Sequence, residues 1–154
     1  MVITGKTLCL AIMANAAFFG HSSATRACRY SSSIVKEAKK NKLDPTVLAA
    51  MLHVESNWKP HVVSYAGACG IAQVMPQWSK YTCAQLKNPK IGLPEGARKL
   101  NYWVYKYGKG NLSVGLCGYN AGFRCKGNNP NRRGVLYAKK VLKVAKKIRK
   151  SIDK

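Results

Sequence analysis

The stretch Asp44–Ser56, DPTVLAAMLHVES, is the strongest helix signal in this chain of 154 residues. Asp44 is a good N-cap, and Pro45 suits the first turn, where its missing N–H costs no hydrogen bond. Three apolar residues then recur at helical spacing and predict one face directed at a core: Leu48, Met51 and Leu52. Glu55 falls on the same face, so the helix carries a carboxyl group toward the protein interior.

Helical patterns also dominate the rest of the chain, and no segment shows the alternation of apolar and polar residues that a strand would give. Further helices are expected after a cap at Ser31–Ser33, briefly at Ile71–Met75, from Pro94 to about Tyr107, at Ser113–Asn120, and at about 135–152. The length suits one compact domain. The sequence therefore predicts a mainly α, single-domain protein.

Residues 1–24 are typical of an export signal peptide. Lys6 supplies a positive charge, residues 7–20 are almost wholly apolar, and Ser22–Ala24 offers small residues for cleavage. The apolar run is too short to span a bilayer comfortably, so a retained membrane anchor is the weaker alternative. We expect cleavage after Ala24, which leaves residues 25–154 as a domain in the periplasm, the cell envelope or the extracellular space.

The net charge is strongly positive, at +22 for the chain and +21 once the signal with its single charged residue, Lys6, is removed. Such a field attracts anionic partners. For an exported protein these are envelope polymers or a membrane surface, and nucleic acid is not expected. The helix at about 135–152 is basic and amphipathic. We favour a helix packed on the domain with a solvated basic face; a membrane-active helix is the alternative.

The cysteines predict disulfides. Of the six, Cys9 leaves with the predicted signal, and five remain in an oxidising compartment, so one would stay free or pair with another chain. The short-loop pairing would join Cys69 with Cys83 and Cys117 with Cys125, with other pairings open. Cleavage before Cys28 would allow a lipid anchor, although the preceding residues fit a lipoprotein signal poorly. No metal site is expected, because CxxC pairs are absent and histidines are few.

The acidic residues are few, and they narrow the chemistry: Glu37, Asp44, Glu55, Glu95 and Asp153. Four have structural interpretations: Glu37 on an exposed lysine-rich face, Asp44 as a cap, Glu95 in a first turn, and Asp153 in the tail. Glu55 has no such interpretation, because it lies on an apolar helix face. Burial there would keep its carboxyl group protonated near neutrality, as a general acid for glycosidic cleavage must be. From position alone, a helix-end Glu paired with a lysine is an equal alternative.

No other acidic residue is well placed to act as a second catalytic carboxylate. Glycosidases that use two catalytic carboxyl groups place them roughly 5–9.5 Å apart. Asp44 precedes Glu55 by eleven residues on one predicted helix, and this puts it about 16 Å away. A mechanism with one acid is therefore favoured.

Three motifs follow one another in the chain: Glu55-Ser56, SYAGACGIAQVMP at residues 64–76, and GYNAG at residues 118–122. In order and spacing they resemble the catalytic domain of soluble lytic transglycosylases, in the lysozyme-like superfamily, over roughly residues 33–142. The resemblance implies a lysozyme-like fold and cleavage of the β-1,4 bond between N-acetylmuramic acid and N-acetylglucosamine in peptidoglycan. In that family one Glu acts as acid and then as base while the sugar's own 6-hydroxyl attacks. The products carry 1,6-anhydro ends, and no cofactor is required.

The same resemblance implies roles for seven residues. Glu55 would be catalytic, and the expected substrate-binding residues are Ser56, Gln73, Met75, Tyr119, Asn120 and Tyr137. Ser56 would hold the substrate or its acetamido group, and Tyr137 would close the site. By composition alone, Met75 and Tyr119 could equally be core residues. Two glycines, Gly115 and Gly118, are expected to loosen the helix that carries GYNAG.

Two rival functions stay open. A goose-type-lysozyme-like hydrolase would share the fold but add water, and a cationic envelope-binding or antimicrobial protein would carry the fold without activity. A wall-remodelling enzyme, a part of a secretion or conjugation machine, and a phage lysis or virion protein would all fit, with size and charge leaning slightly toward phage. We expect a monomer, with exo or endo cleavage open.

Overall fold

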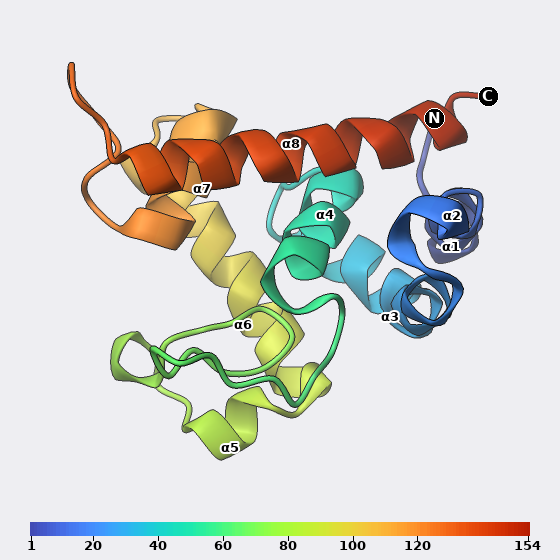
Figure 1. Ribbon diagram of the computed structural model, residues 1–154, viewed down its shortest axis with the longest axis horizontal. Coiled ribbons are helices and arrows are strands. Elements are labelled where there is room, and N and C mark those ends of the chain that lie inside the picture. Colours follow the sequence, from blue (N-terminus) through green and yellow to red (C-terminus); the bar gives the residue numbers. More distant parts are fainter.

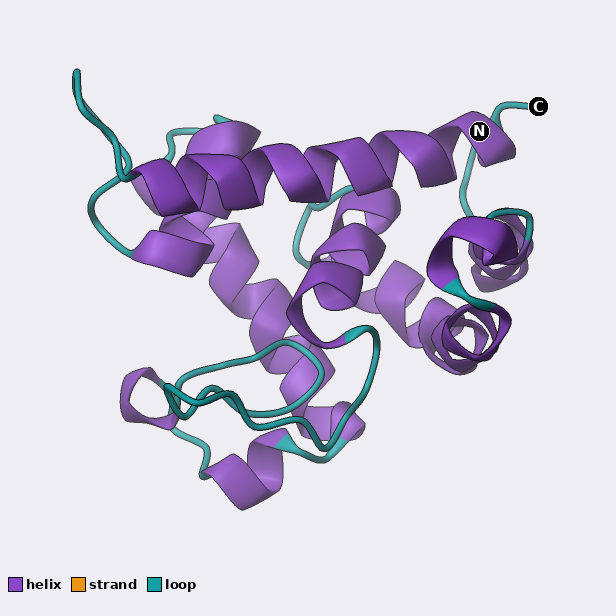
Figure 2. Cartoon of the chain, in the orientation of Figure 1, coloured by secondary structure: helices purple, strands orange, loops and turns teal.

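The computed structural model describes residues 1–154 as helices joined by turns and loops, with isolated bridges but no β-sheet (Figure 2). The α-helices are α1 (Gly5–Met13), α2 (Ala16–Phe19), α3 (His21–Lys40), α4 (Pro45–Ser56), α5 (Cys83–Leu86), α6 (Pro89–Asn101), α7 (Leu112–Ala121) and α8 (Arg132–Ile152). Two shorter elements are the 3₁₀ turn η1 (Pro76–Trp78) and the π-helical segment η2 (Tyr102–Tyr107). The mainly α prediction is confirmed.

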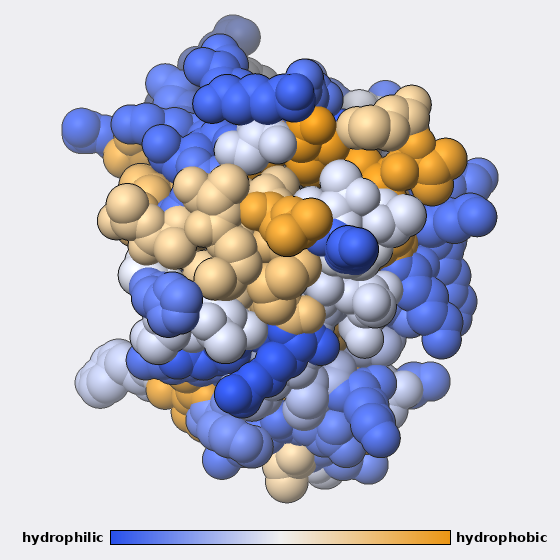
Figure 3. All heavy atoms as spheres, turned by 90° about the vertical axis from the view of Figure 1, so that its right-hand side faces the viewer, coloured by the Kyte–Doolittle hydropathy of each residue, from blue (hydrophilic) through white to orange (hydrophobic).

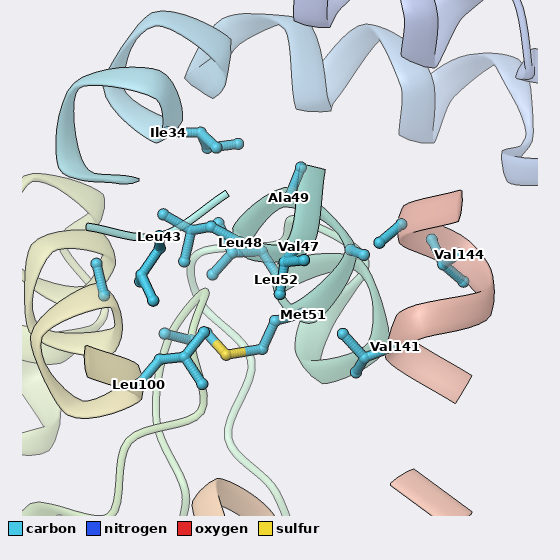
Figure 4. Close-up of a cluster of buried hydrophobic side chains, with 14 of the residues drawn as sticks. Ile34, Leu43, Val47, Leu48, Ala49, Met51, Leu52, Leu100, Val141 and Val144 are labelled. Atoms are coloured by element: carbon cyan, nitrogen blue, oxygen red, sulfur yellow. The ribbon is translucent and has the colours of Figure 1, made fainter. Parts of the chain in front are cut away.

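Helix α4 lies at the centre of the fold. Its N-terminus is capped as the sequence predicts, with the Asp44 carboxylate accepting a hydrogen bond from the Thr46 amide at 2.8 Å. The predicted apolar face is fully buried, at 0% exposure for each of its residues. Figure 4 shows this face between Ile34 of α3, Leu100 of α6, and Val141 and Val144 of α8. Burial of α4 on several sides fixes the position of Glu55 near its C-terminal end.

Helix α8 runs across the molecule above α4 and α7 (Figure 1). It begins three residues before the predicted start, because the Asn131 side chain caps the Gly134 amide at 2.9 Å. Its apolar stripe is buried against the domain, including Val141, Val144, Ala145 and Ile148. The predicted packing of this helix is therefore confirmed, and its basic residues lie largely outward.

Two predicted helix starts are wrong by five residues or more, and one predicted helix does not form. Helix α3 starts at His21 rather than after Ser31–Ser33, and α6 starts at Pro89 with Pro94 inside it. The α6 start has the same signal as α4, since Asn88 accepts from the Lys90 amide at 3.0 Å and Pro89 follows it. Ile71–Met75 is not helical: Val74 pairs with Cys69 through backbone bonds of 3.0 and 3.1 Å.

The glycines of α7 tighten the packing rather than loosen the helix. A Cβ on Gly118 would lie 2.5 Å from the Trp103 ring, and one on Gly115 would lie 2.6 Å from the Val104 Cα. Both neighbours belong to η2, so the missing side chains let α7 and η2 approach closely. The expectation of a loosened helix is therefore wrong.

Two disulfides have the short-loop pairing, Cys69–Cys83 and Cys117–Cys125. A third bond joins Cys9 to Cys28, and no cysteine is free in the full chain. The odd cysteine predicted from the sequence follows only if Cys9 is removed. The fate of residues 1–24 therefore decides the state of Cys28.

The N-terminal helices pack on the domain with one side only. Leu8 and Ile12 are fully buried, whereas Leu10 is 59% and Phe18 53% exposed. Figure 3 views this side of the molecule, where apolar atoms gather within a hydrophilic surround. A segment that is apolar on its exposed side as well as its buried side has the composition of a signal peptide. Cleavage after Ala24 falls within α3 and stays a prediction.

If cleavage occurs there, the exported protein should contain one reactive thiol, at Cys28, because its partner Cys9 has been removed. Intact mass spectrometry combined with thiol labelling under denaturing, non-reducing conditions measures both properties. A Cys28→Ser variant is the control and should lose the label. An exported chain that keeps residues 1–24 and carries no thiol would contradict the signal-peptide prediction.

Candidate active site

Glu55 and Tyr137 contact each other, although neither is among the residues that line the cavity described below. Glu55 is the second-last residue of α4, and Tyr137 lies in the second turn of α8, 82 residues further along the chain. The Tyr137 hydroxyl donates a hydrogen bond of 2.5 Å to Glu55 Oε1. The crossing of α8 over α4 creates this contact, so two residues predicted for one site are brought together.

Burial raises the pKa of Glu55 from 4.5 to about 7, and the Tyr137 hydrogen bond acts in the opposite direction. Burial, followed by the charge of Glu55, also holds the pKa of Tyr137 well above its usual range, so the phenol stays a donor. Near neutral pH the protonated and ionised forms of Glu55 therefore lie close in free energy. A carboxyl group of this kind can give up a proton and take one back under the same conditions.

Tyr137→Phe should move the pH dependence of activity upward. The phenol hydrogen bond stabilises the Glu55 carboxylate, so its loss raises the pKa of Glu55 further. If catalysis requires protonated Glu55, activity should fall as pH rises through about 7 in the wild type and about one pH unit higher in the variant. The profile of kcat/KM against pH is the measurement. An unchanged or lowered midpoint would mean that the hydrogen bond does not control Glu55.

Tyr119 and Ser56 secure the loop beside Glu55. The Tyr119 hydroxyl donates to the Ala72 carbonyl at 2.6 Å, and burial, with the nearby charges of Glu55 and Glu95, raises its pKa well above 10. The buried Ser56 hydroxyl donates a hydrogen bond of 2.7 Å to the Ile71 carbonyl. Ser56 therefore holds the loop against α4. Its contact with substrate stays a prediction.

The loop from Val62 to Val74 supplies the predicted groove residues Gln73 and, one residue beyond, Met75. Gln73 has a left-handed backbone, with φ of 51°, and its amide donates to the Val62 and Gly70 carbonyls at 2.9 Å each. The Cys69–Cys83 disulfide ties the same loop to α5. These internal bonds restrain the backbone of the loop.

A cavity of about 650 Å³ opens beside these elements, and it is large enough for a ligand of several rings. Four of the predicted binding residues line it: Gln73, Met75, Tyr119 and Asn120. Asn120 is exposed and its side chain makes no hydrogen bond within the protein, so its amide is available to a ligand.

Sequence reasoning missed further residues that line this cavity. They carry aromatic and cationic side chains: Trp78, Arg98, Lys99, Tyr102, Trp103, Phe123 and Arg124. Trp78 and Phe123 are 74% and 70% exposed. Their positions directly after the second and third motifs were the available signal, because aromatic residues next to site motifs are good candidates for sugar contacts.

Two acidic residues differ from their predicted environments. Glu37 is buried at 8% exposure rather than exposed, and Glu95 lies in the middle of α6 rather than in a first turn. The Glu95 carboxylate accepts bonds from Arg98 at 2.8 and 3.0 Å and from Ser79 at 2.9 Å. Burial tends to raise the pKa of Glu95, but these partners hold it below its usual range. The Glu95 carboxylate is therefore held in an ion pair close to the site and is not free to act as a catalytic base.

Three further observations concern metal ligands, membrane spans and a histidine. No three metal-ligating side chains gather at one place. None of the helices is both long enough and apolar enough to cross a bilayer. The His53 ring lies against the Phe19 and Trp58 rings, with centroids 4.8 and 4.9 Å away.

The fold and the position of the site define the class as lysozyme-like helical domains. Residues 32–141 match the family described as the transglycosylase SLT domain, and the chain belongs to this family. The fold is also similar to that of an inactive mutant of lytic transglycosylase Slt from Pseudomonas aeruginosa, with a TM-score of 0.72 and 20% identity. That match covers 92% of this chain and 27% of the other.

Similar curated proteins are membrane-bound lytic murein transglycosylases C. The protein from Actinobacillus pleuropneumoniae serotype 5b is 38% identical over 52 residues, which make up 34% of this chain and 14% of the relative. The protein from Histophilus somni strain 2336 is 34% identical over 64 residues, or 42% and 18% of the two chains. This chain thus matches less than a fifth of each relative. Its disulfides and this family indicate an extracytoplasmic location.

Proposed function

We propose that the protein is a peptidoglycan lytic transglycosylase that cleaves the β-1,4 bond between N-acetylmuramic acid and N-acetylglucosamine. The observation that carries the proposal is the half-buried Glu55, with its pKa raised to about 7 and its carboxyl group hydrogen-bonded to Tyr137. Family membership supports the substrate class, since SLT domains act on peptidoglycan.

In the proposed mechanism, protonated Glu55 gives its proton to the glycosidic oxygen as the bond to the anomeric carbon breaks. The resulting carboxylate takes the proton from the 6-hydroxyl of the muramic acid, whose oxygen bonds to the anomeric carbon. The product is a 1,6-anhydro ring, and Glu55 is protonated again. A pKa near 7 suits both steps, because neither protonation state is strongly favoured.

The surroundings of Glu55 support a mechanism without a second free carboxylate. The Glu95 carboxylate is bonded to Arg98 and Ser79, and Asp44 caps the other end of α4 and pairs with Arg149. Neither is available to activate a water molecule. The exposed Asn120 amide and the cavity-lining Met75 and Gln73 are proposed to contact the sugars.

Mass spectrometry of digested cell walls tests the reaction type. Fragments should end in anhydro-muramic acid, one water lighter than hydrolysed ends, because the intramolecular hydroxyl replaces water as nucleophile. Hydrolysed reducing ends as the main product would identify a goose-type-lysozyme-like hydrolase. A purified, folded protein that releases no fragments would favour a cationic envelope-binding role.

A further inference from the structure

The outward side of α8 carries one line of cationic side chains. On a helix, positions that alternate between four and three residues apart lie on one face. In α8 this face is occupied by six exposed residues, which we call the outer line: Arg132, Leu136, Lys139, Lys143, Lys146 and Lys150. The buried stripe of α8, which includes Val141 and Ile148, lies on the opposite side of the helix. The outer line therefore faces away from the domain over a length of about 27 Å.

No acidic group neutralises the outer line. Helix α8 contains no acidic residue, and its one ion pair, between Arg149 and Asp44, uses a cation that is not part of the line. No salt bridge involves any of the five cations of the line. Like charges three and four residues apart repel each other on a helix, so this pattern lowers the stability of α8. Folding does not explain the pattern, whereas binding to an anionic partner does.

The outer line extends beyond the part of the chain that matches the SLT family. That match ends at residue 141, and Lys143, Lys146 and Lys150 all follow it. Helix α8 is uninterrupted and runs along the outside of the molecule above α4 and α7 (Figure 1). These lysines therefore form an exposed surface that is separate from the candidate active site.

The composition of the outer line favours a lipid surface over a nucleic acid or a free polymer. Anionic head groups lie in a plane and attract lysines close to it. Leu136 is 54% exposed among the cations, and an apolar side chain in this position can enter the membrane interface. Single-stranded nucleic acids are bound through aromatic side chains that stack on the bases, and the outer line contains no aromatic residue.

We propose that the outer line docks the protein on the surface of an anionic phospholipid membrane, with α8 parallel to that surface. The apolar stripe of α8 stays packed on the domain, so docking requires no insertion of the helix. The inference goes beyond the proposed function, because none of the six residues lines the cavity. Helix α8 is also present whether or not residues 1–24 are removed.

Vesicle binding by the purified protein tests the inference. In co-sedimentation, vesicles that contain phosphatidylglycerol and phosphatidylcholine should bind the protein, and vesicles of phosphatidylcholine alone should bind it far more weakly. The triple variant Lys139→Gln, Lys143→Gln and Lys146→Gln should lower the affinity for the anionic vesicles about a hundredfold, since three charges leave the surface. Leu136→Ser should lower it about threefold because an apolar contact with the interface is lost.

Three exposed lysines of α3, Lys36, Lys39 and Lys40, provide the matched control. Helix α4 separates α3 from α8 (Figure 4), so changing all three to Gln removes the same charge from another part of the surface. This control should lower the vesicle affinity about threefold or less, since charges beyond a Debye length from the membrane are largely screened. Equal losses from the two triple variants would overturn the inference, because net charge alone would then cause binding.

Two further measurements separate docking from folding and from catalysis. The α8 triple variant should unfold at the same temperature as the wild type or a higher one, because repulsion along the helix is removed. A lower unfolding temperature would mean that folding requires the line. Strong binding to soluble polyphosphate without binding to anionic vesicles would also overturn the inference. Cleavage of soluble glycan oligomers should proceed at the wild-type rate in this variant, so docking and the proposed function can fail independently.

Discussion

Glu55→Gln should lower the rate of glycan cleavage at least about a thousandfold, because one side chain supplies both the acid and the base of the reaction. Glutamine keeps the shape and the capacity to accept the Tyr137 hydrogen bond, which is 2.5 Å long in the wild type. It has no acidic proton to give to the leaving oxygen. The measurement is the initial rate of fragment release from purified cell walls.

Glu37→Gln is the matched control, since Glu37 is also a buried carboxyl, at 8% exposure, but lies on α3 away from the cavity lining. Its rate should stay close to that of the wild type. If Glu55→Gln retained a tenth of the activity or more, another acid would have to carry the reaction.

Glu55→Gln should also be more stable than the wild type at high pH. The folded-state pKa of Glu55, about 7, lies above the unfolded value near 4.5, so the folded protein binds more protons between these limits. The contribution of Glu55 to the free energy of unfolding is therefore fully present below about pH 4.5 and lost as pH rises through 7. Glutamine does not titrate, and at pH 8 it should recover up to about 3 kcal/mol. Urea titrations at pH 4.5 and pH 8 measure the difference.

Gly70→Ala should destabilise the protein by about 2–5 kcal/mol, since it combines a strained backbone with a steric clash. Gly70 has a φ of +82°, and a Cβ there would lie 2.1 Å from the Leu86 carbonyl oxygen. Leu86 is fully buried at the end of α5, so its backbone has little room to move. Displacement of this loop would also move Gln73 and lower the activity.

Gly67→Ala provides the comparison, because Gly67 also has a positive φ, +92°, but has no atom within 4 Å of the added Cβ. It should cost only about 1 kcal/mol from the backbone conformation. Denaturant titrations of both variants isolate the clash as the difference between them. Equal losses would mean that Leu86 gives way and that the close approach does not constrain the loop.

Much of the fold follows from local patterns that the sequence contains. Asp44 and Pro45 start α4 as predicted. The Asp44 side chain finds its hydrogen-bond partner only two residues away, at the Thr46 amide, and Pro45 has no backbone N–H that needs a partner. The apolar stripes of α4 and α8 are buried, since a helix must cover its apolar face. The predictions that failed have different causes. Val74, in the segment predicted to be helical, pairs with Cys69 instead, and Gly118 is small because Trp103 lies against it. The start of α6 has a local signal, Asn88 and Pro89, that the prediction did not use.

The sequence by itself determined that Glu55 would be carried inward on a helix, and the order of three motifs identified the family before any contact was known. Only the tertiary structure decided what surrounds the carboxyl group. The hydroxyl of Tyr137, 82 residues away, reaches Glu55 because α8 crosses α4, and Glu95 is occupied by Arg98 and Ser79 within the fold. The physical reason is that helix propensity and apolar spacing act over one or two turns. A pKa, by contrast, depends on burial and on neighbours that the chain brings together only when it folds.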